Sequence, residues 1–224
     1  MCMYRYLLFD LDGTLTDSAP GITRCVQYAM HSLGFEEPDL EKLRCFVGPP
    51  LKDMFMEYCG WPEETAEKAI EKYRERFQKV GMFENSVYDG IPAVLEKLAG
   101  RDCVIVVASS KPEKFCRIIM EHFGIAQYFD EIVGASLDGK RCEKIDVISE
   151  AFRRLQITEE QKREVLMIGD RKHDAWGARL AGVDCLGVYY GFADPGELEE
   201  AGAKYVVNTV SEMGALLETI TSEV

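Results

Sequence analysis

The chain has 224 residues, of which 47% are hydrophobic and 29% are charged; these proportions exclude an intrinsically disordered protein and are typical of a soluble globular one. The formal net charge of −13 argues against non-specific binding to nucleic acid, because such binding needs a basic surface. The length allows one large domain, or one domain that carries a smaller one.

Short apolar runs, which predict strands, alternate with amphipathic patterns, which predict helices, along most of the chain. The run at residues 103–108 is continuously apolar, as in a strand that is buried on both faces. In chain order, strands are expected at residues 4–9, 103–108, 131–135, 165–169, 183–188 and 204–207. This alternation predicts an α/β fold, in which helices cover both faces of a doubly wound, Rossmann-like parallel sheet.

One segment interrupts the alternation soon after the first strand. Between residues 18 and 88 the sequence has helical patterns and no convincing strand. The turn FVGPPL at residues 46–51 cannot be helical because of its two prolines. We therefore predict that residues 17–88 form an all-helical cap domain, and that residues 1–16 and 89–224 form the α/β core.

The first predicted strand ends in a pair of aspartates within YLLFDLDGTLTD. Asp10 and Asp12 lie two residues apart, and like charges this close usually need a cation, a proton or a ligand between them. Ligands of open parallel sheets bind beyond the carboxyl ends of the strands, so polar residues that follow other strands are candidates for the same site. With a lysine that opens a predicted helix, they are Ser109, Ser110, Lys111, Lys144, Asp170 and Asp174.

Taken in order, these candidates resemble the four motifs of the haloacid dehalogenase-like hydrolases. DLDGT resembles the first motif, D-x-D-G-T. Ser109 resembles the Ser/Thr of the second motif, Lys144 the lysine of the third, and Asp170 with Asp174 the acidic residues of the fourth. The stretches DSAPGI, FVGPPL, ASSKPE, GASLDGKR and YGF resemble the phosphoglycolate phosphatase-like branch, so the resemblance covers essentially the whole chain. It also implies that the helical insert is the cap that this family carries.

The chemistry of the residues and the resemblance suggest the same catalytic roles. A carboxylate can attack phosphorus, so Asp10 is expected to be the nucleophile that forms an aspartyl-phosphate. Asp12 is expected to protonate the leaving oxygen and later to activate water as general acid and base. By the resemblance, Ser109 would hold a phosphate oxygen, and Lys144 would neutralise developing charge and restrain Asp10.

The cofactor that we expect is Mg²⁺, because this ion takes one or two carboxylates together with waters and phosphate oxygens. The resemblance implies that the side chains of Asp10 and Asp170 and the backbone carbonyl of Asp12 are its ligands. Asp174 would lie in or beside the metal site. Alternatively, Asp174 could serve only as a charge at the start of a helix.

Four further residues are expected to contact the substrate. Ser110 and Lys111 would bind phosphate beside Ser109, although all three could instead serve the start of the following helix, whose N-terminus itself favours anions. In the cap, the resemblance implies that Arg44 and the turn at Gly48 face the open site and touch the substrate.

We therefore expect a Mg²⁺-dependent phosphatase that hydrolyses a small soluble phosphate monoester, similar to phosphoglycolate phosphatase. The alternatives are a 5′-nucleotidase acting on nucleoside monophosphates and, as a weaker candidate, a sugar phosphomutase, which would return the phosphoryl group to its substrate. Asp12 counts against a dehalogenase or a phosphonatase. A phospho-receiver domain would carry its phosphorylated aspartate on a later strand and would have no inserted cap.

The remaining expectations concern location and partners. The N-terminal stretch lacks the apolar core of a signal peptide, and no run is long enough for a membrane span, so we expect a cytoplasmic protein. Its eight cysteines and three histidines show no C-x-x-C pair or zinc-binding pattern. No basic segment suggests a nucleic-acid or membrane partner. We expect a monomer or a homodimer, and the sequence leaves the substrate and the pathway open.

Overall fold

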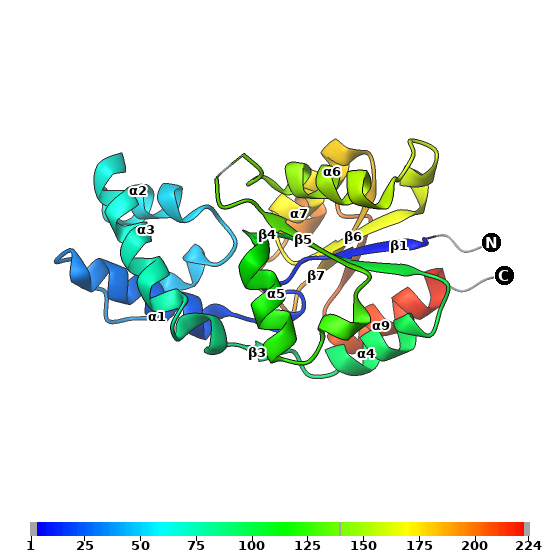
Figure 1. The fold of residues 1–224 in the computed structure, drawn as a ribbon, viewed down its shortest axis with the longest axis horizontal. Coiled ribbons are helices and arrows are strands. Elements are labelled where there is room, and N and C mark those ends of the chain that lie inside the picture. The colour runs from blue at the N-terminus through cyan, green and yellow to red at the C-terminus, as the bar shows by residue number, and fades with distance from the viewer. Residues whose placement is uncertain (1–3, 139, 222–224) are drawn as a thin grey trace. The chain divides into compact units, whose positions relative to one another are not determined.

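The computed structural model describes residues 4–138 and 140–221 of the protein (Figure 1). Within this part of the chain, six strands form one sheet in the order β5–β4–β1–β6–β7–β8, and every neighbouring pair is parallel. The strands are β1 (Tyr6–Phe9), β4 (Val104–Pro112), β5 (Glu131–Ala135), β6 (Val165–Gly169), β7 (Asp184–Val188) and β8 (Tyr205–Val207). The predicted fold class, an α/β protein with a doubly wound parallel sheet, is confirmed.

The middle strand β1 is buried along its whole length. Leu7 lies opposite Ile105 of β4 and Leu166 of β6, and all three side chains are buried. Because helices cover both faces of the sheet, its strands are continuous apolar runs rather than alternating ones. The first polar residues after these runs therefore stand at the carboxyl ends of the strands.

Helices cover both faces of the sheet: Figure 1 shows α6 and α7 on one side and α4, α5 and α9 on the other. These helices are α4 (Ile91–Ala99), α5 (Glu113–His122), α6 (Lys144–Leu155), α7 (Lys172–Ala181) and α9 (Val210–Ile220), with the short α8 (Glu197–Glu200) before β8. Val147 of α6 and Ala178 of α7 belong to the same buried cluster as Leu8 and Met167 of the sheet. Among residues 4–138 and 140–221, no helix combines the length and the apolar character that a membrane crossing requires.

Two predicted strands differ from the observed ones by more than one residue. β1 begins at Tyr6 rather than at residue 4. β4 continues beyond residue 108 to Pro112, with an irregular pairing in which Ser109 lies opposite Gly134 and Pro112 opposite Ala135. The extension was missed because its residues are polar, and the apolar run on which the prediction depended ends at Ala108.

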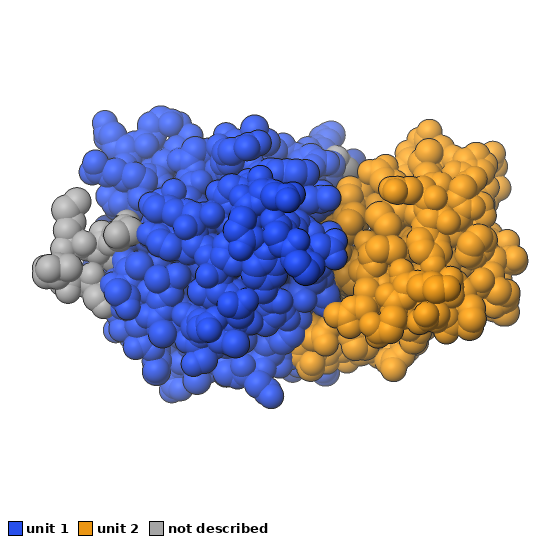
Figure 2. Space-filling view, turned by 180° about the vertical axis from the view of Figure 1, so that it is seen from behind, with its two compact units in different colours: residues 1–16, 87–224 blue, residues 17–86 orange. Residues whose placement is uncertain are grey.

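Contacts divide the described chain into two compact units, residues 1–16 with 87–224 and residues 17–86 (Figure 2). The second unit contains α1 (Ala19–Ser32), α2 (Leu51–Cys59) and α3 (Glu63–Phe77), and the short 3₁₀ helices η1 (Lys42–Phe46) and η2 (Gly81–Phe83). It contains a group of packed aromatic rings, in which Phe55 contacts Phe46 and Trp61. The role of this unit as a cap stays a prediction.

The ends of the second unit differ from the sequence-based expectation. Residues 18–88 were expected to contain no strand, whereas Ser86–Val87 form β3, which pairs with β2 (Thr16–Asp17). Two residues are too few to produce a periodic pattern. Val87 and Tyr88 belong to the first unit, where the Tyr88 backbone N–H donates to the Leu15 carbonyl and its ring packs on Tyr190.

Candidate active site

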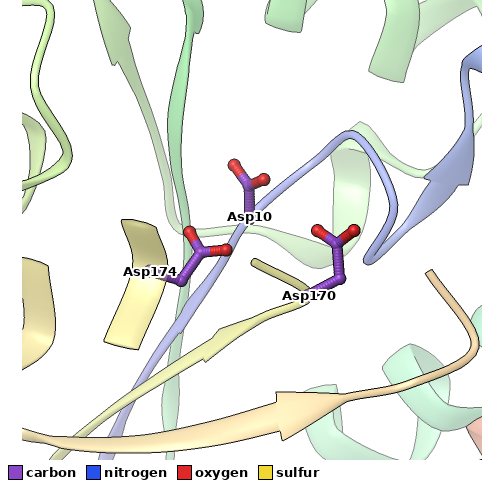
Figure 3. A group of neighbouring side chains, drawn as sticks. All are labelled: Asp10, Asp170 and Asp174. Carbon is purple, nitrogen blue, oxygen red and sulfur yellow. The ribbon is translucent and has the colours of Figure 1, made fainter. Parts of the chain in front are cut away.

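The candidate active site lies at the carboxyl ends of β1 and β6. Asp10 follows β1, Asp170 follows β6, and Asp174 lies in the first turn of α7. One carboxylate oxygen from each of these residues lies within 4.8 Å of the others, and Figure 3 shows the side chains as neighbours. Asp170 and Asp174 are buried, and Asp10 is partly exposed. The fold thus joins residues that are up to 164 positions apart in the sequence.

Removal from bulk water disfavours the ionised forms of the Asp10 and Asp170 carboxylates. Burial raises the pKa of Asp10 to about 6; the Lys144 ammonium opposes this shift, and the Asp174 carboxylate adds to it. Burial also raises the pKa of Asp170 well above its ordinary value, with further contributions from Asp174 and Asp10. A cation bound between Asp10 and Asp170 would favour the ionised forms of both groups.

Lys144 is the first residue of α6, as predicted, and it supplies a positive charge to this cluster. Its Nζ atom donates to Asp10 Oδ1 at 2.8 Å and to the Ala108 carbonyl at 2.9 Å, and it lies 2.7 Å from Asp174 Oδ1. The side chain is only 5% exposed. Burial opposes the charge, but Asp10 and Asp174 attract it more strongly, so the pKa of Lys144 lies above its ordinary value.

A glycine in the neighbouring helix makes the burial of Lys144 possible. A Cβ atom at Gly177 of α7 would lie 2.6 Å from Lys144 Cγ and 2.8 Å from its Cβ. Any larger residue at 177 would therefore push the lysine stem away from α7. Gly177 could not be identified from the sequence, because a glycine in an amphipathic helix carries no sign of the side chain that it accommodates.

Asp174 uses both carboxylate oxygens within the protein. Oδ1 is paired with Lys144, and Oδ2 accepts from the backbone N–H of Arg171 at 3.0 Å. The alternative role considered for Asp174, a charge at the start of a helix, is therefore part of the observed geometry, since Asp174 both caps α7 and faces Lys144. Asp174 stands beside the Asp10–Asp170 pair as a residue that orients Lys144.

Asp12 forms an ion pair that the sequence analysis did not expect. Lys111 Nζ contacts Asp12 Oδ2, and the two side chains are only 7% and 13% exposed. The second oxygen, Asp12 Oδ1, is buried and accepts no hydrogen bond from the described residues. Lys111 was predicted as a phosphate contact, whereas here it is paired with the candidate acid and base. This pairing was missed because the residue type of Lys111 does not reveal which rotamer its side chain adopts.

Ser109 and Ser110 lie on the polar extension of β4. Ser109 is buried, and its Oγ accepts from the Lys111 backbone N–H at 3.3 Å. Ser109 also follows Ala108, whose carbonyl accepts from Lys144. Ser110 is half-buried. Their predicted roles in phosphate binding stay predictions.

Arg44 and Gly48 belong to the second unit. Arg44 lies in η1 and pairs with Glu41 at 3.5 Å. Gly48 has a φ of 102°, a conformation that glycine adopts more readily than any other residue. That these residues contact the substrate stays a prediction.

The acidic site fits a hard divalent cation. Its donors are carboxylate oxygens, which suit Mg²⁺, and one oxygen from each of Asp10, Asp170 and Asp174 lies within 4.8 Å of the others. Asp10 and Asp170 would hold the ion, with the backbone carbonyl of Asp12 as a further oxygen donor. Thr14, which the sequence reasoning did not single out, donates from Oγ1 to Asp170 Oδ1 at 3.4 Å.

Comparisons with known proteins agree with this arrangement. A family model described as haloacid dehalogenase-like hydrolase matches residues 7–188. A protein from Pseudomonas aeruginosa named 5′-nucleotidase is 45% identical over 219 residues, which cover 98% of this chain and 96% of that protein. A Mycobacterium tuberculosis protein named tyrosine-protein kinase PtkA is 37% identical over 211 residues, or 93% of this chain and 71% of that protein.

A more distant relative, from Vibrio parahaemolyticus, is named phosphoglycolate phosphatase and is 25% identical over 217 residues, which cover 93% of this chain and 94% of that protein. Among solved structures, a predicted phosphatase from Clostridium acetobutylicum matches with a TM-score of 0.92 and 50% identity. That match covers 97% of this chain and 99% of the other.

Replacing Asp170 with asparagine is expected to stabilise the metal-free protein at neutral and alkaline pH. Because its pKa is raised by folding, Asp170 contributes stability below the ordinary value of 3.8, and this contribution is lost as pH rises through the raised value. The amide keeps the shape and removes the charge. The melting temperature of Asp170→Asn should therefore exceed that of the wild type at pH 8, by roughly 2–4 °C for each kcal/mol gained, and the difference should shrink toward pH 4.

The measurement is thermal unfolding in a chelating buffer from pH 4 to pH 8.5. Asp102→Asn is the matched control, because the Asp102 side chain is 78% exposed and its pairing with Arg5 is loose, at 3.8 Å. A melting temperature of Asp170→Asn at or below that of the wild type at pH 8 would contradict the prediction.

Replacing Lys144 with methionine is expected to lower the free energy of unfolding by about 3–5 kcal/mol, because it leaves the buried Asp174 and the largely buried Asp10 without their cation. Methionine retains the length of the stem, so the change removes mainly charge. Urea unfolding of the metal-free protein at pH 8 measures the loss. The exposed Lys114 of α5 provides the control, Lys114→Met. Equal losses for the two variants would show that the cluster does not depend on Lys144.

Proposed function

The chain belongs to the haloacid dehalogenase-like hydrolases, and from this premise we propose that it is a Mg²⁺-dependent phosphatase that hydrolyses a nucleoside monophosphate or a similarly small phosphate monoester through an aspartyl-phosphate at Asp10. The observation that carries the proposal is the placement of Asp10 directly after the central strand, bonded to a buried lysine and next to Asp170. A carboxylate held in this way can serve as a nucleophile of fixed orientation.

In the first half of the reaction, a carboxylate oxygen of Asp10 attacks phosphorus, and the bond between phosphorus and the leaving oxygen breaks. Asp12 gives its proton to that oxygen, so the alcohol leaves neutral. In the second half, Asp12 takes a proton from water, whose oxygen attacks the phosphorus of the aspartyl-phosphate. Inorganic phosphate leaves and Asp10 is restored.

The other residues keep these two groups in place. Lys144 holds Asp10 Oδ1, and Asp174 holds Lys144, so the nucleophile cannot rotate freely. Lys111 contacts Asp12 and must yield when the leaving oxygen approaches this carboxylate. Mg²⁺, when held by Asp10 and Asp170, would stabilise negative charge on the phosphoryl oxygens.

The choice of substrate depends on the relatives. The relative named 5′-nucleotidase shares 45% of its residues over nearly its whole length, whereas the one named phosphoglycolate phosphatase shares 25%. Both names are those of phosphate monoester hydrolases. We therefore place nucleoside monophosphates before phosphoglycolate, which reverses the order expected from the sequence. A cytoplasmic location and a monomeric or homodimeric state stay predictions.

The proposal predicts that kcat/KM for phosphate release, measured with Mg²⁺ over a panel of monoesters, is highest for a nucleoside 5′-monophosphate. The panel includes 2-phosphoglycolate and hexose phosphates. Asp10→Asn should lower activity by at least about 10⁴-fold, because it removes the nucleophile. Asp12→Asn should retain more activity on p-nitrophenyl phosphate than on alkyl esters, because a good leaving group needs no acid.

A maximum for 2-phosphoglycolate would restore the order expected from the sequence. Absence of phosphate release from every ester, with a folded and metal-loaded protein, would overturn the proposal. Transfer of the phosphoryl group back to a sugar, seen as an isomerised product without phosphate release, would favour the mutase instead.

A further inference from the structure

The loop between β7 and α8 lies against the candidate metal site, although no residue in it was predicted to take part. Asp170 is confined between two glycines: Gly13, after β1, and Gly191, in this loop. A Cβ atom at Gly13 would lie 2.1 Å from Asp170 Oδ2. A Cβ atom at Gly191 would lie 2.5 Å from Asp170 Cβ and 2.6 Å from Oδ2.

A glycine is required at position 191 because neighbouring atoms approach its Cα closely, and not because of its backbone conformation. Its φ is not among the positive values found for other glycines of the chain, so an alanine could adopt the same backbone. The obstacle is space, since its Cβ would also lie 2.3 Å from the Gly13 carbonyl oxygen. Because that oxygen belongs to the backbone of the first motif, the clash cannot be relieved by a rotamer change.

The residues on either side of Gly191 each hold one part of the site. The Phe192 backbone N–H donates to Asp170 Oδ2 at 2.8 Å. The Tyr190 hydroxyl donates to the Thr14 carbonyl at 2.9 Å, and it also lies 3.3 Å from Met213 Sδ. Three consecutive residues therefore contact both the turn that carries the nucleophile and the carboxylate after β6.

The far end of the loop is tied to the same region. Glu197, at the start of α8, accepts from the Lys172 backbone N–H at 2.7 Å and from Arg171 Nε at 2.9 Å. Arg171 directly follows Asp170. The loop is thus fixed on both sides of Asp170, and its backbone cannot move away without breaking several hydrogen bonds.

We propose that Tyr190, Gly191 and Phe192 form a positioning element, the Asp170 clamp, which fixes the orientation of the Asp170 carboxylate for a divalent cation. This inference rests on the metal site of the proposed function. A carboxylate can rotate about its last bond, and binding a cation would have to halt that rotation. The Phe192 N–H and the two glycine backbones halt it beforehand, so that less conformational freedom is lost when the cation binds.

The main test is Gly191→Ala in the full chain, with Gly100→Ala as the matched control. Gly100 has a φ of −81°, and a Cβ there would meet its nearest atom at 3.6 Å, an ordinary contact. Binding of Mn²⁺ is titrated by the loss of the free-ion signal in electron paramagnetic resonance, and Mg²⁺ is then titrated by competition. We expect Gly191→Ala to weaken binding by about 10- to 100-fold and Gly100→Ala to leave it unchanged.

If Gly191→Ala does not fold, a second pair of variants tests the Asp170 clamp. Tyr190→Phe removes the hydroxyl that holds the Thr14 carbonyl. Tyr189→Phe makes the same change one residue earlier, where the hydroxyl contacts Glu199 and accepts from the Gly196 N–H, away from Asp170. We expect Tyr190→Phe to weaken Mn²⁺ binding by roughly fivefold, the effect of one hydrogen bond, and Tyr189→Phe to have no effect.

Loss of affinity in Gly191→Ala or Tyr190→Phe, with both controls unchanged, supports the clamp. Wild-type affinity in every folded variant overturns it, as does an equal loss in Tyr189→Phe, which would indicate general loosening of the loop. The readout is metal binding and not turnover. Failure of the wild type to hydrolyse monoesters would therefore refute the proposed function while leaving a measured difference in Mn²⁺ affinity to stand.

Discussion

The arrangement of this site depends on one buried ammonium group. Lys144 Nζ lies within hydrogen-bonding distance of both Asp10 and Asp174, and its side chain is almost fully buried. Without it, the closely spaced carboxylates would have to take up protons, because burial already raises the pKa of Asp10 and of Asp170. The packing of α6 against α7, with Gly177 facing the lysine stem, follows from the need to bring this charge to the end of β1.

The need to bury these charged groups lowers the stability of the folded protein. Charged groups at the end of an apolar sheet are costly, and only the buried core around β1 and its neighbours offsets that cost. A cation at Asp10 and Asp170 would relieve it. A bound cation would therefore also stabilise the folded protein.

The predicted site residues are divided between the two compact units. The unit that contains the sheet carries the residues for which we propose reactive roles, namely Asp10, Asp12, Lys144 and Asp170. Arg44 and Gly48 lie in the helical unit. Relatives with different names, a 5′-nucleotidase and a phosphoglycolate phosphatase, match nearly the whole chain. This is the expected pattern when one reaction centre is retained and substrate choice changes around it.

Most elements and the candidate site residues could be predicted from the amino-acid sequence, because both depend on local pattern. Strands buried on both faces are continuous apolar runs, and the runs at 131–135 and 165–169 match the observed strands residue for residue. Since parallel strands end at one edge, Asp10 and Asp170 could be placed near each other before any coordinates were known. The resemblance to the family motifs then suggested the chemical roles of these two residues.

The contacts that hold those residues could not be predicted, because they form between elements that are distant in the sequence. The Lys111–Asp12 pair depends on a rotamer and on the irregular end of β4. The donor from Phe192 is a backbone N–H, which every residue except proline possesses, so no residue type announces it. Gly177 and Gly191 matter for what packs against them, and such contacts join segments far apart in the chain. A sequence records side-chain identity, whereas orientation arises from packing between elements.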